Sequence, residues 1–301
     1  MGFIVFKGVF TPVITVFDNN GEIDYAGNRR VIERLIDAGV DGILFLGSIG
    51  EFFSLSLKEK MKFITFAIKI VNKRTNVLIG TGGTVIDEVV SLTKFAESEG
   101  ADAAVVISPY YFNLDEDSLY RYYAQVASSV EMPIILYNFP DRTSINMSPQ
   151  LIHKLAKDYS NIVGIKDTVD NISHTRKIIE EVKSDKKEFA VFSGFDEYLV
   201  PNLMAGGNGI ITGLTNIAPE LFINLYKAFE ENNYVEVAKV QKKVNKLMQI
   251  YDASWLFISS IKTGVSMLVP DISDKPRQPF AGCTEIETQK VREILKKVNI
   301  L

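Results

Sequence analysis

Short apolar runs and longer amphipathic segments alternate along most of the chain. The apolar runs lack the polar alternation of a half-exposed strand, and they predict strands at residues 9–13, 42–46, 77–81, 103–108, 133–138, 162–166, 189–193 and 209–212. The segments between them carry apolar residues at helical spacing, as in Ile32, Leu35 and Ile36. Such strands, separated by helices, are typical of a parallel sheet that is covered on both faces. Eight units of this kind predict an α/β fold, a closed (β/α)8 TIM barrel, with an open doubly wound sheet as the alternative.

The pattern changes near Pro219, where the strand signal stops. Helical spacing continues and predicts helices at residues 221–229, 235–251, 259–268 and 285–298. No low-complexity stretch or Gly/Ser linker divides the chain. We therefore expect a barrel over residues 1–218 and a C-terminal helical extension over residues 219–301 that packs on it.

Composition and charge narrow the classes of function. The 301 residues carry a formal net charge of −4, so no overall positive field attracts nucleic acid or an anionic membrane. The chain lacks the run of about 18 apolar residues that spans a membrane, and its first residues lack the pattern of a secretory leader. Cys283 is the single cysteine, so no intrachain disulfide forms, which agrees with a reducing compartment. The sequence thus predicts a soluble cytoplasmic protein that binds neither nucleic acid nor membranes.

The most unusual polar residue lies at the end of a predicted strand, where barrel enzymes have their active sites. Lys166 ends the apolar run 162–166, and a buried cation is costly unless it is paired or discharged. One interpretation is a lysine that reaches the rim or pairs with Asp167. The other is a desolvated, neutral amine that attacks a ketone and forms a Schiff base, which needs no metal or organic cofactor.

Two further strand ends carry groups that suit a Schiff-base reaction. Tyr137 ends the preceding strand, and its phenol can exchange protons beside an imine; alternatively, it is a core aromatic bonded to the backbone. Ser48 and the amides around Ile49 and Gly50 precede a helix and can hold a carboxylate. In the simpler interpretation, the glycines there only permit a tight turn.

Other motifs carry less chemistry. The glycine-rich segment 80–84 lacks the Lys-Ser/Thr ending of a phosphate loop, so we interpret it as a turn at a strand end. His153 and His174 fall within expected helices and form no ligand cluster with Cys283, so we expect no zinc or other metal site.

Taken together, these features resemble the dihydrodipicolinate synthase / N-acetylneuraminate lyase family of class I aldolases. The resemblance covers nearly the whole chain and rests on ordered motifs: Gly-Val-Phe-Thr-Pro-Val at 8–13, Gly-Ser-Ile-Gly-Glu at 47–51, Pro-Tyr-Tyr at 109–111, Tyr-Asn-Phe-Pro at 137–140, Gly-Ile-Lys-Asp at 164–167 and Gly-Gly-Asn-Gly at 206–209. It implies a cofactor-free lyase or synthase. Its substrates would be pyruvate with a small aldehyde, or a 2-keto-3-deoxy sugar acid.

The resemblance also implies roles for four side chains. Lys166 would form an imine with the keto carbon of pyruvate, and Tyr137 would move protons to and from that imine. Ser48 would relay protons between Tyr137 and Tyr111. In the family this last tyrosine reaches in from a neighbouring subunit, so the resemblance implies a homo-oligomer, commonly a tetramer built as a dimer of dimers.

The substrate carboxylate would be held by the backbone between Gly47 and Gly50, including Ile49, and the carbonyl of Ile211 would face the site. Ile49 departs from the family pattern, because many members have a second hydroxyl residue at this position. A lost hydroxyl contact to a charged ligand costs about 1.5–3 kcal/mol unless another group replaces it.

Arg142 is the residue that distinguishes between reactions. It follows Tyr-Asn-Phe-Pro-Asp, where the family's synthases carry an arginine for the carboxylate of aspartate semialdehyde, and bidentate carboxylate binding suits arginine. A rim arginine that pairs with Asp141 or organises the tyrosine relay is the simpler interpretation. On this residue we favour a 4-hydroxy-tetrahydrodipicolinate (dihydrodipicolinate) synthase of lysine biosynthesis. Leu57 and Lys60 replace histidines of lysine-sensitive synthases, so strong inhibition by lysine is not expected.

Two alternatives stay open at this point. The Gly-Ser-Ile-Gly-Glu-Phe and Tyr-Asn-Phe-Pro motifs resemble aldolases that cleave 2-keto-3-deoxy sugar acids, of gluconate or pentonate type. The other alternative is a non-catalytic barrel that only binds a keto acid. The presence of Lys166, Tyr137, Ser48 and Tyr111 together argues against it.

Overall fold

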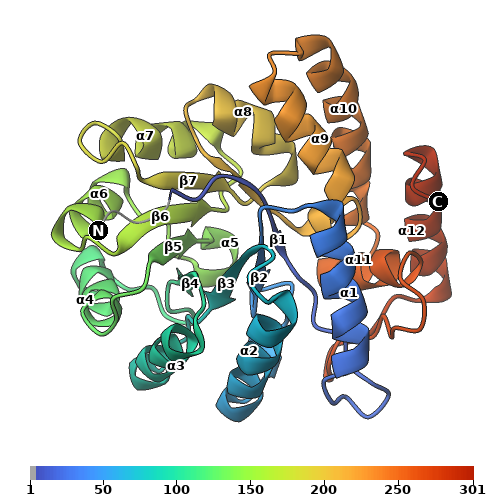
Figure 1. Ribbon diagram of the computed structural model, residues 1–301, viewed down its shortest axis with the longest axis horizontal. Helices are drawn as coiled ribbons and strands as arrows, with labels where there is room; N and C mark the ends of the chain where they lie inside the picture. The colour runs from blue at the N-terminus through green and yellow to red at the C-terminus, as the bar shows by residue number, and fades with distance from the viewer. Residues whose placement is uncertain (1–4) are drawn as a thin grey trace.

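Eight parallel strands close into a barrel at the centre of the molecule (Figure 1), in a computed structural model that describes residues 5–301. Each strand pairs with its neighbours in sequence, and β8 pairs back to β1. The strands are β1 (Gly8–Pro12), β2 (Gly42–Phe45), β3 (Asn76–Gly80), β4 (Ala103–Ile107), β5 (Ile134–Asn138), β6 (Ile162–Asp167), β7 (Ala190–Ser193) and β8 (Gly209–Ile211). The predicted TIM barrel is confirmed, and the open sheet is excluded.

Burial on both faces explains why the strands could be predicted. All residues of β1, β2, β4, β5, β7 and β8 are buried, so their side chains need no polar alternation. Most predicted strand ends lie within one residue of the observed ones. Leu46 shows why some predicted strands run too far: it is buried and apolar, but its φ of 56° already turns the chain out of β2. In the glycine-rich segment 80–84, Gly80 is the last residue of β3 and the other residues lie in the connection to α3, so the segment lies at a strand end as expected.

One glycine permits the barrel to close. Gly209 has φ 144°, and a Cβ atom at this position would lie 1.9 Å from the carbonyl oxygen of Gly8 on β1. No other residue allows the two backbones to approach this closely. The short strand β8 therefore depends on this glycine to meet β1.

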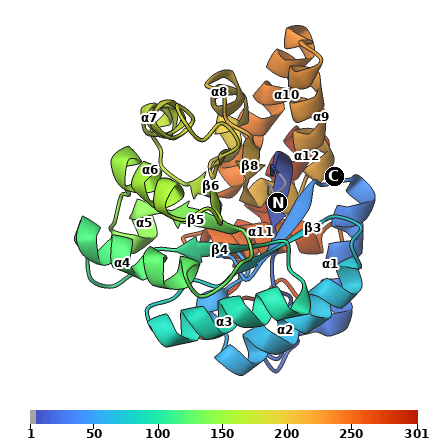
Figure 2. The same ribbon diagram turned by 60° about the vertical axis from the view of Figure 1, so that its left-hand side comes forward.

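Helices surround the barrel (Figures 1 and 2). Within residues 5–301, no helix is long and apolar enough to cross a membrane. Along the first 204 residues the helices are α1 (Tyr25–Ala38), α2 (Leu57–Val71), α3 (Ile86–Glu99), α4 (Glu116–Ala127), α5 (Pro140–Thr143), α6 (Pro149–Asp158), α7 (Ile172–Val182) and α8 (Leu199–Met204). Single 3-10 turns are η1 (Phe52–Ser54), η2 (Asp196–Tyr198), η3 (Gly213–Asn216) and η4 (Met248–Ile250).

Local sequence fixes both ends of these helices, as α1 illustrates. Asp24 caps its start, because its side chain accepts a hydrogen bond of 2.9 Å from the amide of Gly27. Gly39 ends it in the left-handed conformation, with φ 84°. Between the caps, Ile32 and Leu35 are buried against the barrel, as their spacing predicted. His153 and His174 likewise lie on helices, α6 and α7, as expected.

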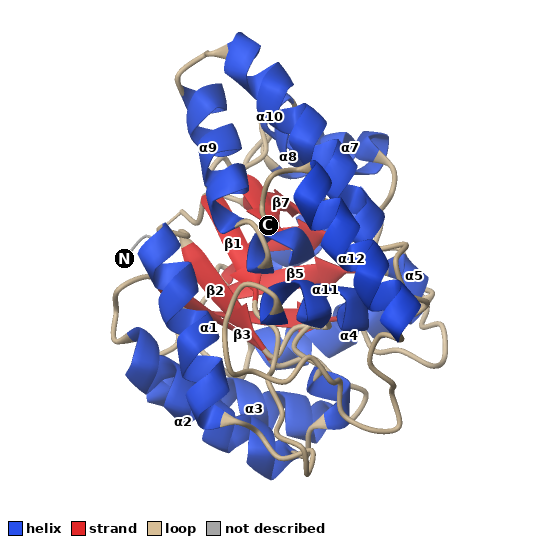
Figure 3. Cartoon of the chain, turned by 90° about the vertical axis from the view of Figure 1, so that its right-hand side faces the viewer, coloured by secondary structure: helices blue, strands red, loops and turns tan. Residues whose placement is uncertain are grey.

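Four helices follow β8: α9 (Pro219–Glu230), α10 (Tyr234–Leu247), α11 (Phe257–Ser266) and α12 (Glu285–Lys297). Helix α9 contacts β1, α1 and α8, so it occupies the eighth position of the helix ring. Figure 3 shows α10 beside α9, and α11 packed with α12. The helix expected at 235–251 is shorter than predicted, because η4 replaces its last turn. The C-terminal helices are confirmed, whereas a domain division after residue 218 stays a prediction.

A buried ion pair connects α11 to the barrel. Lys262 Nζ lies 2.6 Å from Glu51 Oε1, and both side chains are at most 1% exposed. Glu51 also accepts a hydrogen bond of 2.8 Å from the amide of Arg277, whose guanidinium pairs with Glu59 at 2.6 Å. The turn after β2, which contains Ser48, is therefore fixed to the C-terminal extension through Glu51.

We expect Lys262→Met to lower the free energy of unfolding by about 3–5 kcal/mol, because it leaves Glu51 buried without its counter-ion. Urea denaturation measures this change. Lys239→Met is the matched control, since Lys239 pairs with Glu236 on the exposed surface of α10 and little change is expected there. Equal free energies of unfolding for the two variants would contradict a stabilising role for the Lys262–Glu51 ion pair.

Candidate active site

Lys166 and Tyr137 lie side by side at the C-terminal end of the barrel. They are register partners in the β5–β6 ladder, and each residue is 4% exposed. Lys166 Nζ lies 4.3 Å from the centroid of the Tyr137 ring. The structure thus brings together the two side chains that the sequence singled out.

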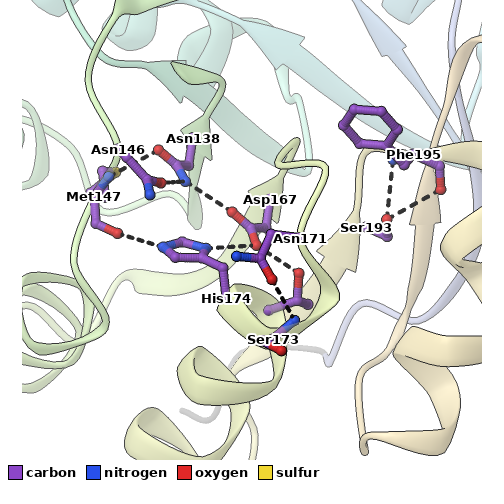
Figure 4. Close-up of polar contacts among 10 residues, drawn as sticks. Asn138, Asn146, Met147, Asp167, Asn171, Ser173, His174, Ser193 and Phe195 are labelled. Atoms are coloured by element: carbon purple, nitrogen blue, oxygen red, sulfur yellow. Dashed lines mark hydrogen bonds and ion pairs between the residues drawn. The ribbon is translucent and has the colours of Figure 1, made fainter. Parts of the chain in front are cut away.

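Asp167, the next residue, has its carboxylate engaged elsewhere (Figure 4). Successive side chains of a strand point to opposite faces, so Asp167 points away from Lys166. Its carboxylate contacts His174 and Thr175 of α7 and Asn138 of β5. The proposed Lys166–Asp167 pair is therefore wrong. Among residues 5–301, no carboxylate lies within ion-pair distance of Lys166 Nζ. The amine lies against the Tyr137 ring instead.

A cleft of about 520 Å³ opens beside these two residues. It contains most of the predicted site residues: Lys166, Tyr137, Ser48, Ile49, Arg142 and Ile211. The other lining residues are Pro12, Phe139, Asp141, Thr168, Gly194, Phe195, Asp196, Glu197, Gly213, Met248, Tyr251, Asp252, Trp255 and Phe257. Gly47 lines a narrower adjoining cavity, together with Ser48 and Tyr137. Gly50 is buried and lines neither space.

The turn after β2 presents two unpaired backbone amides at this cleft. The amide of Glu51 donates to the carbonyl of Ser48 over 3.1 Å, and that of Phe52 to the carbonyl of Gly47 over 3.4 Å, which closes the turn. Within the part of the chain that the structure describes, the amides of Ser48 and Ile49 have no acceptor. Free amides in a turn are suited to an anionic group such as a carboxylate.

Arg142 extends over the cleft from α5. Its guanidinium carbon lies 5.7 Å from the ring centroid of Phe139 and 5.6 Å from that of Phe257. It forms no ion pair with Asp141, so the interpretation as a rim pair is wrong. The aromatic rings instead hold the cation at the mouth of the cleft.

Tyr111 lies outside the cleft of its own chain. Its side chain is 89% exposed, its φ is 91°, and its ring makes an edge contact with Phe112, which is 75% exposed. Its expected role in a neighbouring subunit stays a prediction.

A group of acidic residues on the other side of the cleft was not assigned a role from the sequence. Asp196 is buried at the start of η2, where Tyr251 Oη donates to its Oδ2 over 2.6 Å and the amide of Leu214 donates to its Oδ1 over 3.0 Å. Burial raises the pKa of Asp196 to about 6, although these hydrogen bonds oppose the shift. The Gly-Phe-Asp-Glu run after β7 was the available signal, at a strand end like the other site residues.

Two polar atoms in this acidic group have no partner. Glu197 Oε2 and Thr168 Oγ1 are buried and unpaired, and both residues line the cleft. Gly194 makes room for Thr168, because a Cβ atom at residue 194 would lie 1.9 Å from Thr168 Oγ1. Buried polar atoms normally have hydrogen-bond partners, so two unpaired oxygens in residues of the cleft wall are exceptional.

A family model described as the Dihydrodipicolinate synthetase family matches residues 5–298. The chain belongs to this family. The family includes class I, pyruvate-dependent aldolases, so the chain is an enzyme and the alternative of a non-catalytic barrel is not supported. Within residues 5–301, no three His, Cys, Asp or Glu side chains are grouped as metal ligands.

The chain is similar over its full length to several members of the family. The putative 2-dehydro-3-deoxy-D-gluconate aldolase YagE of Escherichia coli (strain K12) is 38% identical over 98% of each chain. The probable 2-dehydro-3-deoxy-D-pentonate aldolase YjhH of the same strain is also 38% identical, over 98% of each chain. The crystal structure of YagE in complex with pyruvate has a TM-score of 0.97 and covers 99% of this chain and 100% of that one. The 4-hydroxy-tetrahydrodipicolinate synthase of Methanococcus aeolicus is 33% identical, over 98% of this chain and 100% of that protein.

The buried Asp196 predicts a pH dependence of stability. Because its pKa is about 6 in the folded protein and 3.8 ordinarily, the folded state keeps a proton that the unfolded chain has lost. Its contribution is complete below about pH 4 and is lost as the pH rises through 6. We expect urea denaturation to show a decline of about 3 kcal/mol over this range that Asp196→Asn lacks. Parallel pH profiles of the two proteins would contradict this assignment.

Proposed function

We propose that the enzyme cleaves a 2-keto-3-deoxy sugar acid, of gluconate or pentonate type, to pyruvate and an aldehyde. This replaces the synthase favoured on the basis of Arg142. Two relatives at 38% identity bear aldolase names, whereas the synthase of Methanococcus aeolicus is 33% identical.

The acidic side of the cleft is the observation that carries the proposal. Asp196, Glu197 and Thr168 line the cleft, and Glu197 Oε2 and Thr168 Oγ1 are buried without a hydrogen-bond partner. Carboxylates accept hydrogen bonds from sugar hydroxyls, which donate. The same groups repel the carboxylate of aspartate semialdehyde, which the synthase reaction brings in beside that of pyruvate, so they favour a polyhydroxylated chain.

Lys166 and Tyr137 would carry out the chemistry. The amine of Lys166 attacks the C2 keto carbon of the sugar acid, and loss of water gives an iminium ion. Tyr137 takes the proton of the C4 hydroxyl as the C3–C4 bond breaks, and the iminium accepts the electron pair to become an enamine. Protonation of the enamine at C3 and hydrolysis then release pyruvate and restore the amine.

The remaining residues would position the substrate. The free amides of Ser48 and Ile49, with Gly47 and Gly50 shaping the turn, hold the C1 carboxylate, and the hydroxyl of Ser48 relays protons from Tyr137. We propose that Tyr111 completes this relay in a neighbouring subunit, which its exposure permits. The backbone of Ile211 would form part of the wall near the imine, since this residue lines the cleft.

Steady-state rates with the two substrate pairs test the proposal. We expect kcat/KM for pyruvate release from 2-keto-3-deoxygluconate to exceed that for condensation of pyruvate with aspartate semialdehyde by about 100-fold or more, because a site that pairs with hydroxyls rejects a ligand without them. The reverse ratio would identify a synthase and assign Arg142 to the second carboxylate.

A substitution on the acidic side gives a residue-level test. We expect Glu197→Gln to lower kcat/KM for cleavage about tenfold, through loss of a charged hydrogen bond to a hydroxyl. Imine formation with pyruvate alone should be unchanged, because pyruvate has no hydroxyl chain. Glu180→Gln on the exposed surface of α7 is the control, and an equal loss in both variants would overturn the role of Glu197.

A further inference from the structure

A hydrogen-bonded network of Asn138, Asp167 and His174 lies at the ends of β5 and β6 (Figure 4), and its two strand residues directly follow Tyr137 and Lys166 in the sequence. Asn138 and Asp167 form the register pair that follows the Tyr137–Lys166 pair. Asn138 Nδ2 donates to Asp167 Oδ1 over 2.9 Å, and both residues are at most 1% exposed. This bond joins the ends of β5 and β6 one residue beyond the two site residues.

His174 connects this network to a third segment. Its Nδ1 lies 3.0 Å from Asp167 Oδ2, and its Nε2 lies 3.0 Å from the carbonyl oxygen of Met147. Met147 lies between α5, which carries Arg142, and α6. A single imidazole ring therefore holds β6 against the segment that leads from α5.

The hydrogen-bond partners of the ring bear on how many protons it carries. A carbonyl oxygen only accepts, so Nε2 of His174 carries a proton and donates it to Met147. Asp167 Oδ2 already accepts a hydrogen bond of 2.7 Å from Thr175 Oγ1, and Asp167 Oδ1 accepts from Asn138. The 3.0 Å contact between Nδ1 and Oδ2 needs one further proton between these two atoms, and we assign it to His174.

We propose that His174 is a positioning residue, a protonated clamp that acts through Asp167 and Asn138 to fix Lys166 against Tyr137. This inference rests on the imine-forming role proposed for Lys166. Without the ring, Asp167 loses its counter-charge and the link to Met147, and the ends of β5 and β6 are free to separate. Misplacement of reacting groups by about 1 Å costs up to about 100-fold in rate.

The charges around the ring are consistent with this proton. Burial lowers the pKa of His174, but the hydrogen bond and charge of Asp167 outweigh it, and the pKa is raised above its ordinary 6.5. Lys177, one turn along α7, is the charged side chain that opposes protonation. The neighbouring His153 of α6 is engaged with Glu181 and Asp185, further along the chain.

The test is the rate of imine formation with pyruvate, trapped by borohydride. We expect His174→Leu to lower the rate constant at saturating pyruvate about tenfold, with a smaller change in the pyruvate concentration that gives half the maximal rate. His174→Gln keeps amide donors but not the charge, so its rate constant should lie between those of the wild type and His174→Leu. It replaces His174→Leu in the test if that variant does not fold. His153→Gln is the matched control, since His153 is the chain's other histidine and also pairs with acids.

A spectroscopic measurement on His153→Gln tests the proton itself. With His174 as the sole histidine, its nitrogen resonances should show a ring protonated at both nitrogens at pH 6.5 and titrating above it. A neutral ring at pH 6.5, or wild-type rates of imine formation in the folded His174 variants, would overturn the inference. Failure of the wild-type enzyme itself to form an imine would instead refute the proposed function.

Discussion

The parallel register between β5 and β6 is the constraint on which the site depends. It places Tyr137 opposite Lys166, at the carboxyl end of the barrel, and brings Asn138 opposite Asp167 one step further. Side-chain alternation then separates these two pairs, one toward the cleft and one toward the helices. A shift of one residue would exchange the reactive pair for the structural pair. Closure of the barrel through Gly209 fixes the register, because no strand edge is left free.

Two buried lysines of the chain have different surroundings, and we propose different roles for them. Lys262 has a carboxylate 2.6 Å away and forms an internal tie between α11 and the turn after β2. Lys166 is nearly as buried, but the described residues place no carboxylate beside it, and an aromatic ring lies against its amine. Burial alone therefore identifies neither function. The carboxylate beside Lys262, which Lys166 lacks among the described residues, distinguishes the two environments.

Sequence patterns predicted the barrel and the Lys166–Tyr137 pair, because both depend on local periodicity and on neighbouring strand ends. They could not predict the buried environment of Asp196, which depends on Tyr251, a residue far along the chain in the C-terminal extension. For the same reason His174 was interpreted only as a helical residue: its partners come from β6 and from the α5–α6 connection. The sequence could not show that Arg142 lies against Phe257, because this ring comes from the C-terminal extension.

The central claim, that Lys166 forms the imine, is tested most directly by mass spectrometry. The enzyme would be incubated with pyruvate, reduced with borohydride and digested, and every lysine-containing peptide compared with an untreated sample. We predict a reduced pyruvyl adduct on the peptide that carries Lys166 and on no other. The loss of activity should be proportional to the fraction of enzyme that carries the adduct. An adduct on another lysine, or none in folded and active enzyme, would contradict the account.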